Sequence, residues 1–155
     1  MQISRKSDYA LRALVYIAAW ENDKICSINE IAEAEKIPRE YLAKILKELA
    51  LQGFLHSFKG INGGYRLATP REKITFLSII EAMQGKIAVN NCVRNTGSNE
   101  ACNRMAGCAM HGFWNAEQDR VVKSLSSVNL ASLDFENCYP EARRKNSKKQ
   151  PVKVA

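Results

Sequence analysis

The sequence has no long apolar run, because its most hydrophobic stretch, residues 13–20, is only eight residues long. A helix needs about 20 apolar residues to cross a bilayer, so we expect no membrane segment and no membrane partner. Basic residues precede this stretch, as in signal peptides, but residues 20–23 include no small residue of the kind found at a cleavage site. We therefore expect a cytoplasmic protein.

The sequence also has no internal repeat, no glycine fingerprint for a nucleotide and no recognisable catalytic base. These absences argue against an enzyme. Disulfides are not needed for folding, because a chain of 155 residues can bury a core of its own. The length predicts one globular domain with an appended helix.

There is no surplus of acidic residues, and the formal net charge is +7. The basic surplus lies at the two ends: residues 1–71 carry +3 and residues 141–155 carry +5, whereas residues 72–140 carry −1. A basic tail is usually a solvated, disordered end. Where such a tail has a function, it adds non-specific attraction to a polyanion.

The five cysteines are an odd number, and a cytoplasmic setting keeps thiols reduced. Cys92, Cys102, Cys108 and His111 share a polar, glycine-containing segment with the spacing C-x9-C-x5-C-x2-H. Clustered thiols in such a setting indicate a metal or redox site. Thiolates suit iron–sulfur clusters, zinc and Cu(I), and the spacing does not decide between them. The other two cysteines stand alone and are interpreted as non-ligands.

Apolar residues at helical spacing predict three helices, over residues 8–19, 26–37 and 38–52. Ser27 and Glu30 can form a capping box at the second of them. Pro38 can occupy the first position of the third helix, and Gly53 ends it.

The pattern then changes to two short extended segments around the glycine-rich residues 59–63, which predicts a β-hairpin. A further helix begins after Thr75 and ends at Gly85, and a long amphipathic helix over 112–128 leads to a short turn at 129–135. Two helices joined by a tight turn and followed by a hairpin form a winged helix-turn-helix. Basic residues on its second helix favour DNA binding.

In such a module the helix that starts at Pro38 enters the major groove. Arg39 is the candidate for a bidentate guanine contact, because its planar fork matches the O6 and N7 acceptors. Tyr41, Lys44 and Lys47 are its candidate neighbours; the alternatives are core packing for the tyrosine and a solvated helix face for the lysines. At the hairpin tip we expect phosphate or minor-groove contacts from Lys59, Asn62, Gly63 and Gly64, the glycines because they leave no side chain in the way.

The opening residues 3–18, the hairpin sequence FKGINGGYRLA and the cysteine–histidine segment followed by a tryptophan-bearing helix resemble the bacterial iron–sulfur regulators of the IscR and NsrR type. The similarity runs to about Phe135. It implies a homodimer in which the long helix crosses its partner, a cluster in each subunit's loop, and binding to operator half-sites in double-stranded DNA. The spacer between the first two cysteines is longer than in familiar members, and a polar loop can absorb it at slight entropic cost.

With this resemblance, the expected fold class is mainly α with a small β wing, a winged helix-turn-helix plus a long C-terminal dimerisation helix. The expected divisions are a DNA-binding domain at 1–85, a cluster-binding loop at 86–112, a dimerisation helix and short cap at 113–136, and a basic, disordered tail at 137–155.

The resemblance favours an iron–sulfur cluster over zinc at Cys92, Cys102 and Cys108, with 2Fe–2S favoured and 4Fe–4S as the alternative. His111 is the favoured fourth ligand. Members similar to the nitric-oxide-sensing branch lack that histidine and use an aspartate near the N-terminus, so Asp8 is the alternative ligand. The plain explanation of Asp8 is a charge that suits a helix N-terminus.

We therefore expect a DNA-binding transcription regulator whose operator binding is controlled by a cluster that senses iron supply, redox state or nitric oxide. A zinc- or thiol-dependent winged-helix repressor is the alternative within DNA binding. An electron-transfer protein with the same cluster is the alternative from another class.

Overall fold

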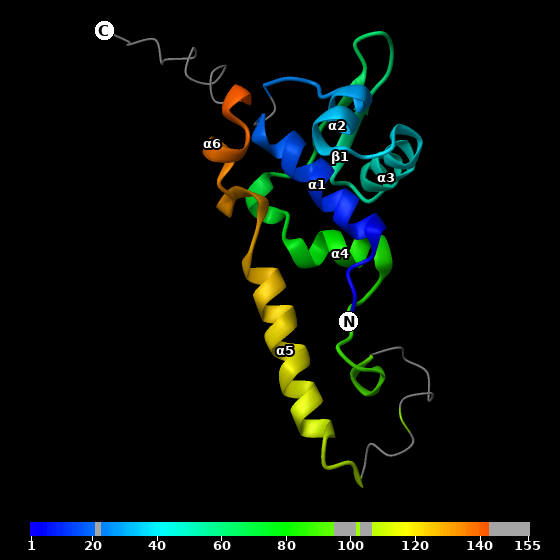
Figure 1. Cartoon of the computed structure of the whole chain (residues 1–155), viewed down its shortest axis with the longest axis vertical. Coiled ribbons are helices and arrows are strands. Elements are labelled where there is room, and N and C mark those ends of the chain that lie inside the picture. The colour runs from blue at the N-terminus through cyan, green and yellow to red at the C-terminus, as the bar shows by residue number, and fades with distance from the viewer. Residues whose placement is uncertain (21–22, 95–101, 103–106, 143–155) are drawn as a thin grey trace, which may run out of the picture.

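The computed structural model describes residues 1–20, 23–94, 102 and 107–142 (Figure 1). Its elements in chain order are α1 (Arg5–Ala19), α2 (Ile28–Glu35), α3 (Arg39–Leu51), β1 (Leu55–Phe58), β2 (Gly64–Leu67), η1 (Arg71–Lys73), α4 (Phe76–Gln84), η2 (Asn91–Val93), α5 (His111–Ser127), η4 (Leu130–Ser132) and α6 (Phe135–Cys138). Within these described ranges, no helix is both long and apolar enough to cross a membrane.

The first helix, α1, lies at the centre of the body and packs against α2, α3 and α4 (Figure 1). Its fully buried residues include Ala10, Ala13, Leu14 and Ala18. The helix begins at Arg5 rather than at residue 8, because the side chain of Ser4 accepts the backbone N–H of Ser7 at 3.1 Å and caps the first turn.

The tight turn between α2 and α3 completes the helix-turn-helix. Ser27 and Glu30 form the predicted capping box, and Lys36 ends α2 in the left-handed conformation with φ at 54°. Pro38 directly precedes α3 instead of occupying its first position, a difference of one residue at the boundary. The apolar stripe of α3 is buried as the periodicity predicts, at Leu42, Ile45, Leu46 and Leu49.

The wing is the antiparallel pair β1 and β2, and its base is fastened to the segment before α2. Tyr65 and Cys26 exchange backbone hydrogen bonds of 2.8 and 2.9 Å. Gly64 is buried against this segment, so that a Cβ atom built on it would lie 2.3 Å from the carbonyl oxygen of Cys26. A Cβ on Gly63 would lie 2.4 Å from the carbonyl oxygen of Phe58. Both glycines are therefore required by packing inside the protein, a constraint that is independent of any approach to DNA.

Beyond the wing, α4 carries the caps that the sequence predicts: Thr75 at its start and Gly85, with φ at 82°, at its end. α5 begins at His111, one residue before the expected start of the helix at 112, and Figure 1 shows it extending away from the body. None of its residues is buried.

The chain after α5 folds back onto the helix-turn-helix. The Tyr139 hydroxyl donates to Glu35 of α2 at 2.8 Å, and its ring meets that of Tyr16 edge-on at 5.7 Å. Ala142 is 3% exposed. The expected disordered tail from residue 137 is therefore wrong for 137–142, because the side chain of Tyr139, bonded to the half-buried Glu35, docks this segment. Residues 143–155 lie outside the described ranges.

Candidate DNA interface and candidate metal centre

The outer face of α3 carries the residues proposed to read DNA. Arg39, Tyr41, Lys44 and Lys47 are all exposed, because the buried stripe of α3 uses the positions between them. The Arg39 Nε donates to the Oδ1 of Asn29 at 2.7 Å. Neither lysine forms an ion pair with a described residue, which leaves both charges available to phosphates.

The environment of Tyr41 is intermediate between the two roles considered for it, a DNA contact and core packing. Its side chain is 41% exposed, yet its ring meets that of Tyr9 edge-on at 5.8 Å. The ring thus packs partly on Tyr9 of α1 and is partly open to the solvent.

The wing tip is the second part of the interface. Lys59 and Asn62 are exposed, and Ile61 between them is fully exposed. Gly60, with φ at 101°, makes the turn. The wing and the first residues of α2 and α3 enclose a hollow of about 330 Å³ that Arg39 also lines. Gly64 also lines this hollow, although its contact with Cys26 buries most of it, and its expected backbone contact with DNA stays a prediction.

The candidate metal ligands lie at the other end of the molecule. Cys92 lies in η2, which packs against α5, and is half-buried; Cys108 is half-buried and Cys102 exposed. All three are free thiols. The described residues do not bring three His, Cys, Asp or Glu side chains together around one point.

Cys108 and His111 meet at the corner where α5 starts. The backbone N–H of His111 donates to the carbonyl oxygen of Cys108 at 3.1 Å, which closes one turn between the two side chains. The Nε2 of His111 lies 3.0 Å from the Nδ2 of Asn115. Its Nδ1 is buried and has no hydrogen-bond partner among the described residues. A buried ring nitrogen without a partner is costly unless a further group satisfies it.

Gln118, a residue that the sequence analysis does not single out, binds the segment between α4 and Cys92. Gln118 of α5 donates to the carbonyl oxygen of Ile87 at 2.9 Å and accepts the backbone N–H of Val89 at 2.9 Å. This pair of hydrogen bonds fixes the segment after α4 against α5, the helix that begins at His111.

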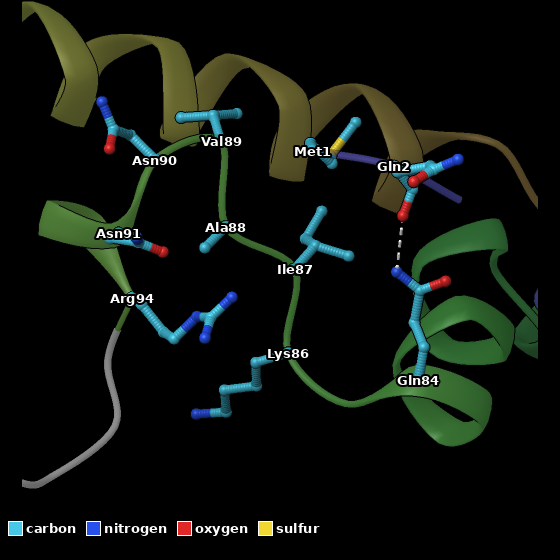
Figure 2. Close-up of a pocket in the computed structure, with 10 residues that line it drawn as sticks. All are labelled: Met1, Gln2, Gln84, Lys86, Ile87, Ala88, Val89, Asn90, Asn91 and Arg94. Atoms are coloured by element: carbon cyan, nitrogen blue, oxygen red, sulfur yellow. Dashed lines mark hydrogen bonds between the residues drawn. The ribbon is translucent and has the colours of Figure 1, made fainter. Parts of the chain in front are cut away.

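The N-terminus lies beside the same segment, as Figure 2 shows. A hollow of about 460 Å³ is lined by the first two residues, by Gln84 at the end of α4, by residues 86–91 and by Arg94. The Nε2 of Gln84 donates to the carbonyl oxygen of Gln2 at 3.0 Å across it. Asp8 does not line this hollow; it is exposed and lies 3.6 Å from Arg12 in an ion pair.

The two remaining cysteines differ in environment. Cys26 is buried beneath the wing, and burial together with the nearby Glu30 carboxylate raises the pKa of its thiol to about 12. It is therefore a protonated packing residue at neutral pH. Cys138 is exposed in α6, away from the start of α5 (Figure 1).

A family model matches residues 3–134, which is most of the chain. The matching family is Rrf2, the iron-dependent transcriptional regulators. This chain belongs to the Rrf2 family. Membership confirms the expected resemblance to winged-helix regulators and makes the chain a transcriptional regulator.

Solved structures agree with this fold. The structure of CymR, the global cysteine regulator of B. subtilis, is 25% identical with a TM-score of 0.71, and the match covers 84% of this chain and 94% of that one. The oxidized form of Staphylococcus aureus CymR is 26% identical with a TM-score of 0.65 and coverage of 84% and 93%. T. potens IscR is 19% identical with a TM-score of 0.66 and coverage of 98% and 93%, a likeness of fold. The mainly helical fold with a two-stranded wing is thus confirmed.

Proposed function

We propose that this Rrf2-family regulator binds operator DNA as a homodimer, and that an iron–sulfur cluster held by Cys92, Cys102, Cys108 and His111 controls that binding. The observation that carries the proposal is the corner at the start of α5. There one hydrogen-bonded turn joins Cys108 to His111, whose buried Nδ1 has no partner in the part of the chain that the structure describes.

The residues present fit such a group. Three free thiols supply the soft ligands that iron–sulfur clusters prefer, and the imidazole supplies a fourth position. A ligating imidazole donates its other ring N–H. The side chain of Asn115 lies at Nε2 through its Nδ2, and with Nδ1 as the ligand its amide would turn over to accept from Nε2 through the oxygen. When bound, the cluster supplies a redox-active centre that is sensitive to oxidants and to iron supply. The hydrogen bonds of Gln118 to Ile87 and Val89 hold the segment before Cys92 against α5, the helix that begins at His111.

On the DNA side, α3 enters the major groove with Arg39 at its leading end, and Tyr41, Lys44 and Lys47 lie along the backbone. Lys59 and Asn62 on the wing contact phosphates, and Gly63 shapes the tip. None of these lysines is paired with a described carboxylate, which supports this assignment.

The two ends communicate through α1. This helix packs on α4, which leads into the cluster segment, and on α3, to which Lys6 is joined by an ion pair of 2.7 Å with Glu48. A cluster that binds one arrangement of these helices better than another must shift DNA affinity by the same coupling free energy.

The dimer is proposed from α5. This helix carries Trp114, Val121 and Leu125 along one side, and Phe113 is 57% exposed, yet no residue of α5 is buried within the chain. A second copy of the helix is the simplest partner for this apolar side.

The proposal is tested by purifying the full chain without oxygen, recording its visible absorption and measuring its iron, sulfide and zinc. Apo and loaded protein are then titrated over operator variants at one salt concentration. We expect an iron–sulfur spectrum and a difference in affinity on at least one variant. Equal affinities for every sequence would make the cluster structural and remove its regulatory role.

A thiol-dependent regulator is the second candidate. Cys102 is exposed and unpaired, and S. aureus CymR, a protein of the same fold, has been solved in an oxidized form. Zinc content, or operator binding that responds to thiol oxidation in iron-free protein, favours this candidate.

A further inference from the structure

The first residue of α3 is tied to the second residue of α2. Asn29 and Arg39 face each other across the turn of the helix-turn-helix, and the Nε of Arg39 donates to the Oδ1 of Asn29 at 2.7 Å. Both residues are exposed, so this hydrogen bond contributes little to the stability of the core. Its consequence lies in where it holds the guanidinium group.

We infer that Asn29 is a positioning residue for base recognition, one that orients Arg39 before DNA arrives. The inference rests on the proposed function, because it concerns the same DNA interface.

A guanidinium group has five N–H donors, and Asn29 engages the single one on Nε. The remaining four, on Nη1 and Nη2, form no hydrogen bond with any described residue. These are the donors that a bidentate contact with the O6 and N7 of guanine can use.

The pair also lies where DNA is expected. Asn29 and Arg39 both line the hollow of about 330 Å³ between the helix-turn-helix and the wing, opposite Gly60 and Ile61 of the wing tip. Arg39 has no carboxylate partner in the described chain, so its charge is not neutralised before binding.

An unrestrained arginine loses rotamer freedom when it binds a base, at a cost comparable to other flexible side chains that become immobilised at interfaces. A hydrogen bond that holds the fork in the free protein removes part of this cost. The expected gain is roughly two- to tenfold in affinity, and only for sequences that present the base that Arg39 reads.

The test is a selection of the full-length protein against a random pool of duplex DNA, followed by titration of the enriched sequences. The proteins compared are the wild type, Asn29→Ala, Arg39→Ala and the double variant. We expect Arg39→Ala to lose a guanine preference in each half-site and Asn29→Ala to weaken the same preference roughly two- to tenfold. The double variant should match Arg39→Ala alone.

Asn29→Asp is a second variant that tests the same contact. Its carboxylate can accept from Nε and from one Nη at the same time, which occupies a donor that guanine needs and neutralises the charge of Arg39. This variant should therefore lose the guanine preference and also bind all sequences more weakly; a guanine preference that survives in Asn29→Asp would contradict the inference. A second readout needs no DNA: the Nε–H proton of Arg39 should exchange with solvent more slowly in the wild type than in Asn29→Ala, by nuclear magnetic resonance.

Several results would overturn the inference. A uniform loss of affinity in Asn29→Ala over all sequences would make Asn29 a phosphate contact. Additive losses in the double variant, or an Arg39→Ala variant that keeps every base preference, would separate Asn29 from base reading. A wild-type protein that enriches no sequence would overturn the proposed DNA function itself, and the inference with it.

Discussion

The two ring nitrogens of His111 lie in different environments. Its Nε2 faces Asn115, whereas its Nδ1 is buried without a partner among the described residues. Asp8, the alternative ligand, is exposed and ion-paired with Arg12, so it already has a role in the free protein. This contrast favours the histidine.

Replacing Cys92, Cys102 or Cys108 singly by Ala should abolish the cluster while the protein remains a folded dimer, because the winged body has its own core. Visible absorption and iron content measure the loss, and circular dichroism checks the fold. Cys138→Ala is the matched control and should keep full occupancy. Full occupancy in any of the three variants would remove that cysteine from the site.

For the fourth position, His111→Ala should change the absorption spectrum, and Asp8→Ala should leave it nearly intact. The measurement is the same spectrum, recorded side by side on anaerobic protein. The opposite pattern would assign the aspartate as the ligand.

Gln118→Ala should release the segment that precedes Cys92, because it removes both hydrogen bonds to Ile87 and Val89. We expect the backbone N–H of Val89 to exchange roughly tenfold faster, which corresponds to about 1.4 kcal/mol of lost local protection. Hydrogen-exchange mass spectrometry measures it. Asp119→Ala, an exposed neighbour on the same helix, should leave the exchange unchanged.

At the scale of elements, the start of α2 is held by charge as well as by its cap. Burial alone would raise the pKa of Glu30, but hydrogen bonds from Lys24 and Tyr16 outweigh it and hold the pKa below its usual value. A carboxylate with a depressed pKa in the folded state stabilises the fold above its unfolded pKa, about 4.3, and loses that effect as the pH falls through its folded pKa.

Glu30→Gln should therefore lower the free energy of unfolding by roughly 1 kcal/mol at neutral pH. The gap from the wild type should shrink as the pH drops below about 4. Urea denaturation over this range measures it. Glu33→Gln, an exposed position on the same helix, should show no pH-dependent gap; a gap there of equal size would trace the effect to net charge.

The packing of the wing depends on the close approach of the Gly64 backbone to the carbonyl oxygen of Cys26. Gly64→Ala should destabilise the protein by about 1–3 kcal/mol, because the new methyl group meets the carbonyl of Cys26. Gly112→Ala is the control: nothing lies within 4 Å of the position that its new methyl group would take, and it sits in the first turn of α5. Urea denaturation of both variants compares them, and a tolerated Gly64→Ala would mean that the strand can shift.

The local elements could be predicted from sequence because their causes are local. The capping residues Ser27 and Thr75, the stop at Gly85 and the apolar stripe of α3 each act within a few neighbouring residues, and all are present. The hairpin is equally predictable from its glycines and from the two short extended segments on either side of them.

Long-range partners are not predictable in this way. The bond from Tyr139 to Glu35 spans 104 residues, and the clamp of Gln118 spans 29 and 31. The packing role of Gly64 depends on a segment that is distant in sequence, so the sequence alone suggests only a role toward DNA. For the candidate metal centre, the sequence identifies the ligand types from their chemistry, whereas the placement of the segment before Cys92 against α5 depends on the long-range hydrogen bonds of Gln118.

For the whole molecule, the C-terminal region divides into a docked part and a charged part. Removing residues 143–155 takes away a net charge of +6, so we expect slower association with DNA and weaker non-specific binding, with base preference unchanged. Stopped-flow association over a salt series measures both. An unchanged salt dependence would show that the tail does not contact DNA.

A longer deletion, of residues 137–155, is compared with the deletion of residues 143–155. This deletion also removes Tyr139 and Ala142, so it should lower the free energy of unfolding by about 2–4 kcal/mol in addition to the charge effect. Equal stability of the two truncated chains would mean that the docked segment adds nothing.

The unburied apolar side of α5 has a genetic consequence. If two copies pair through this helix, a subunit that cannot read DNA still assembles with an intact one, because α5 and α3 are separate elements. Mixed dimers then have one working half, and operator affinity depends on both. Alleles damaged in α3 should therefore be dominant over the normal allele in the same cell, whereas alleles damaged in α5 should be recessive.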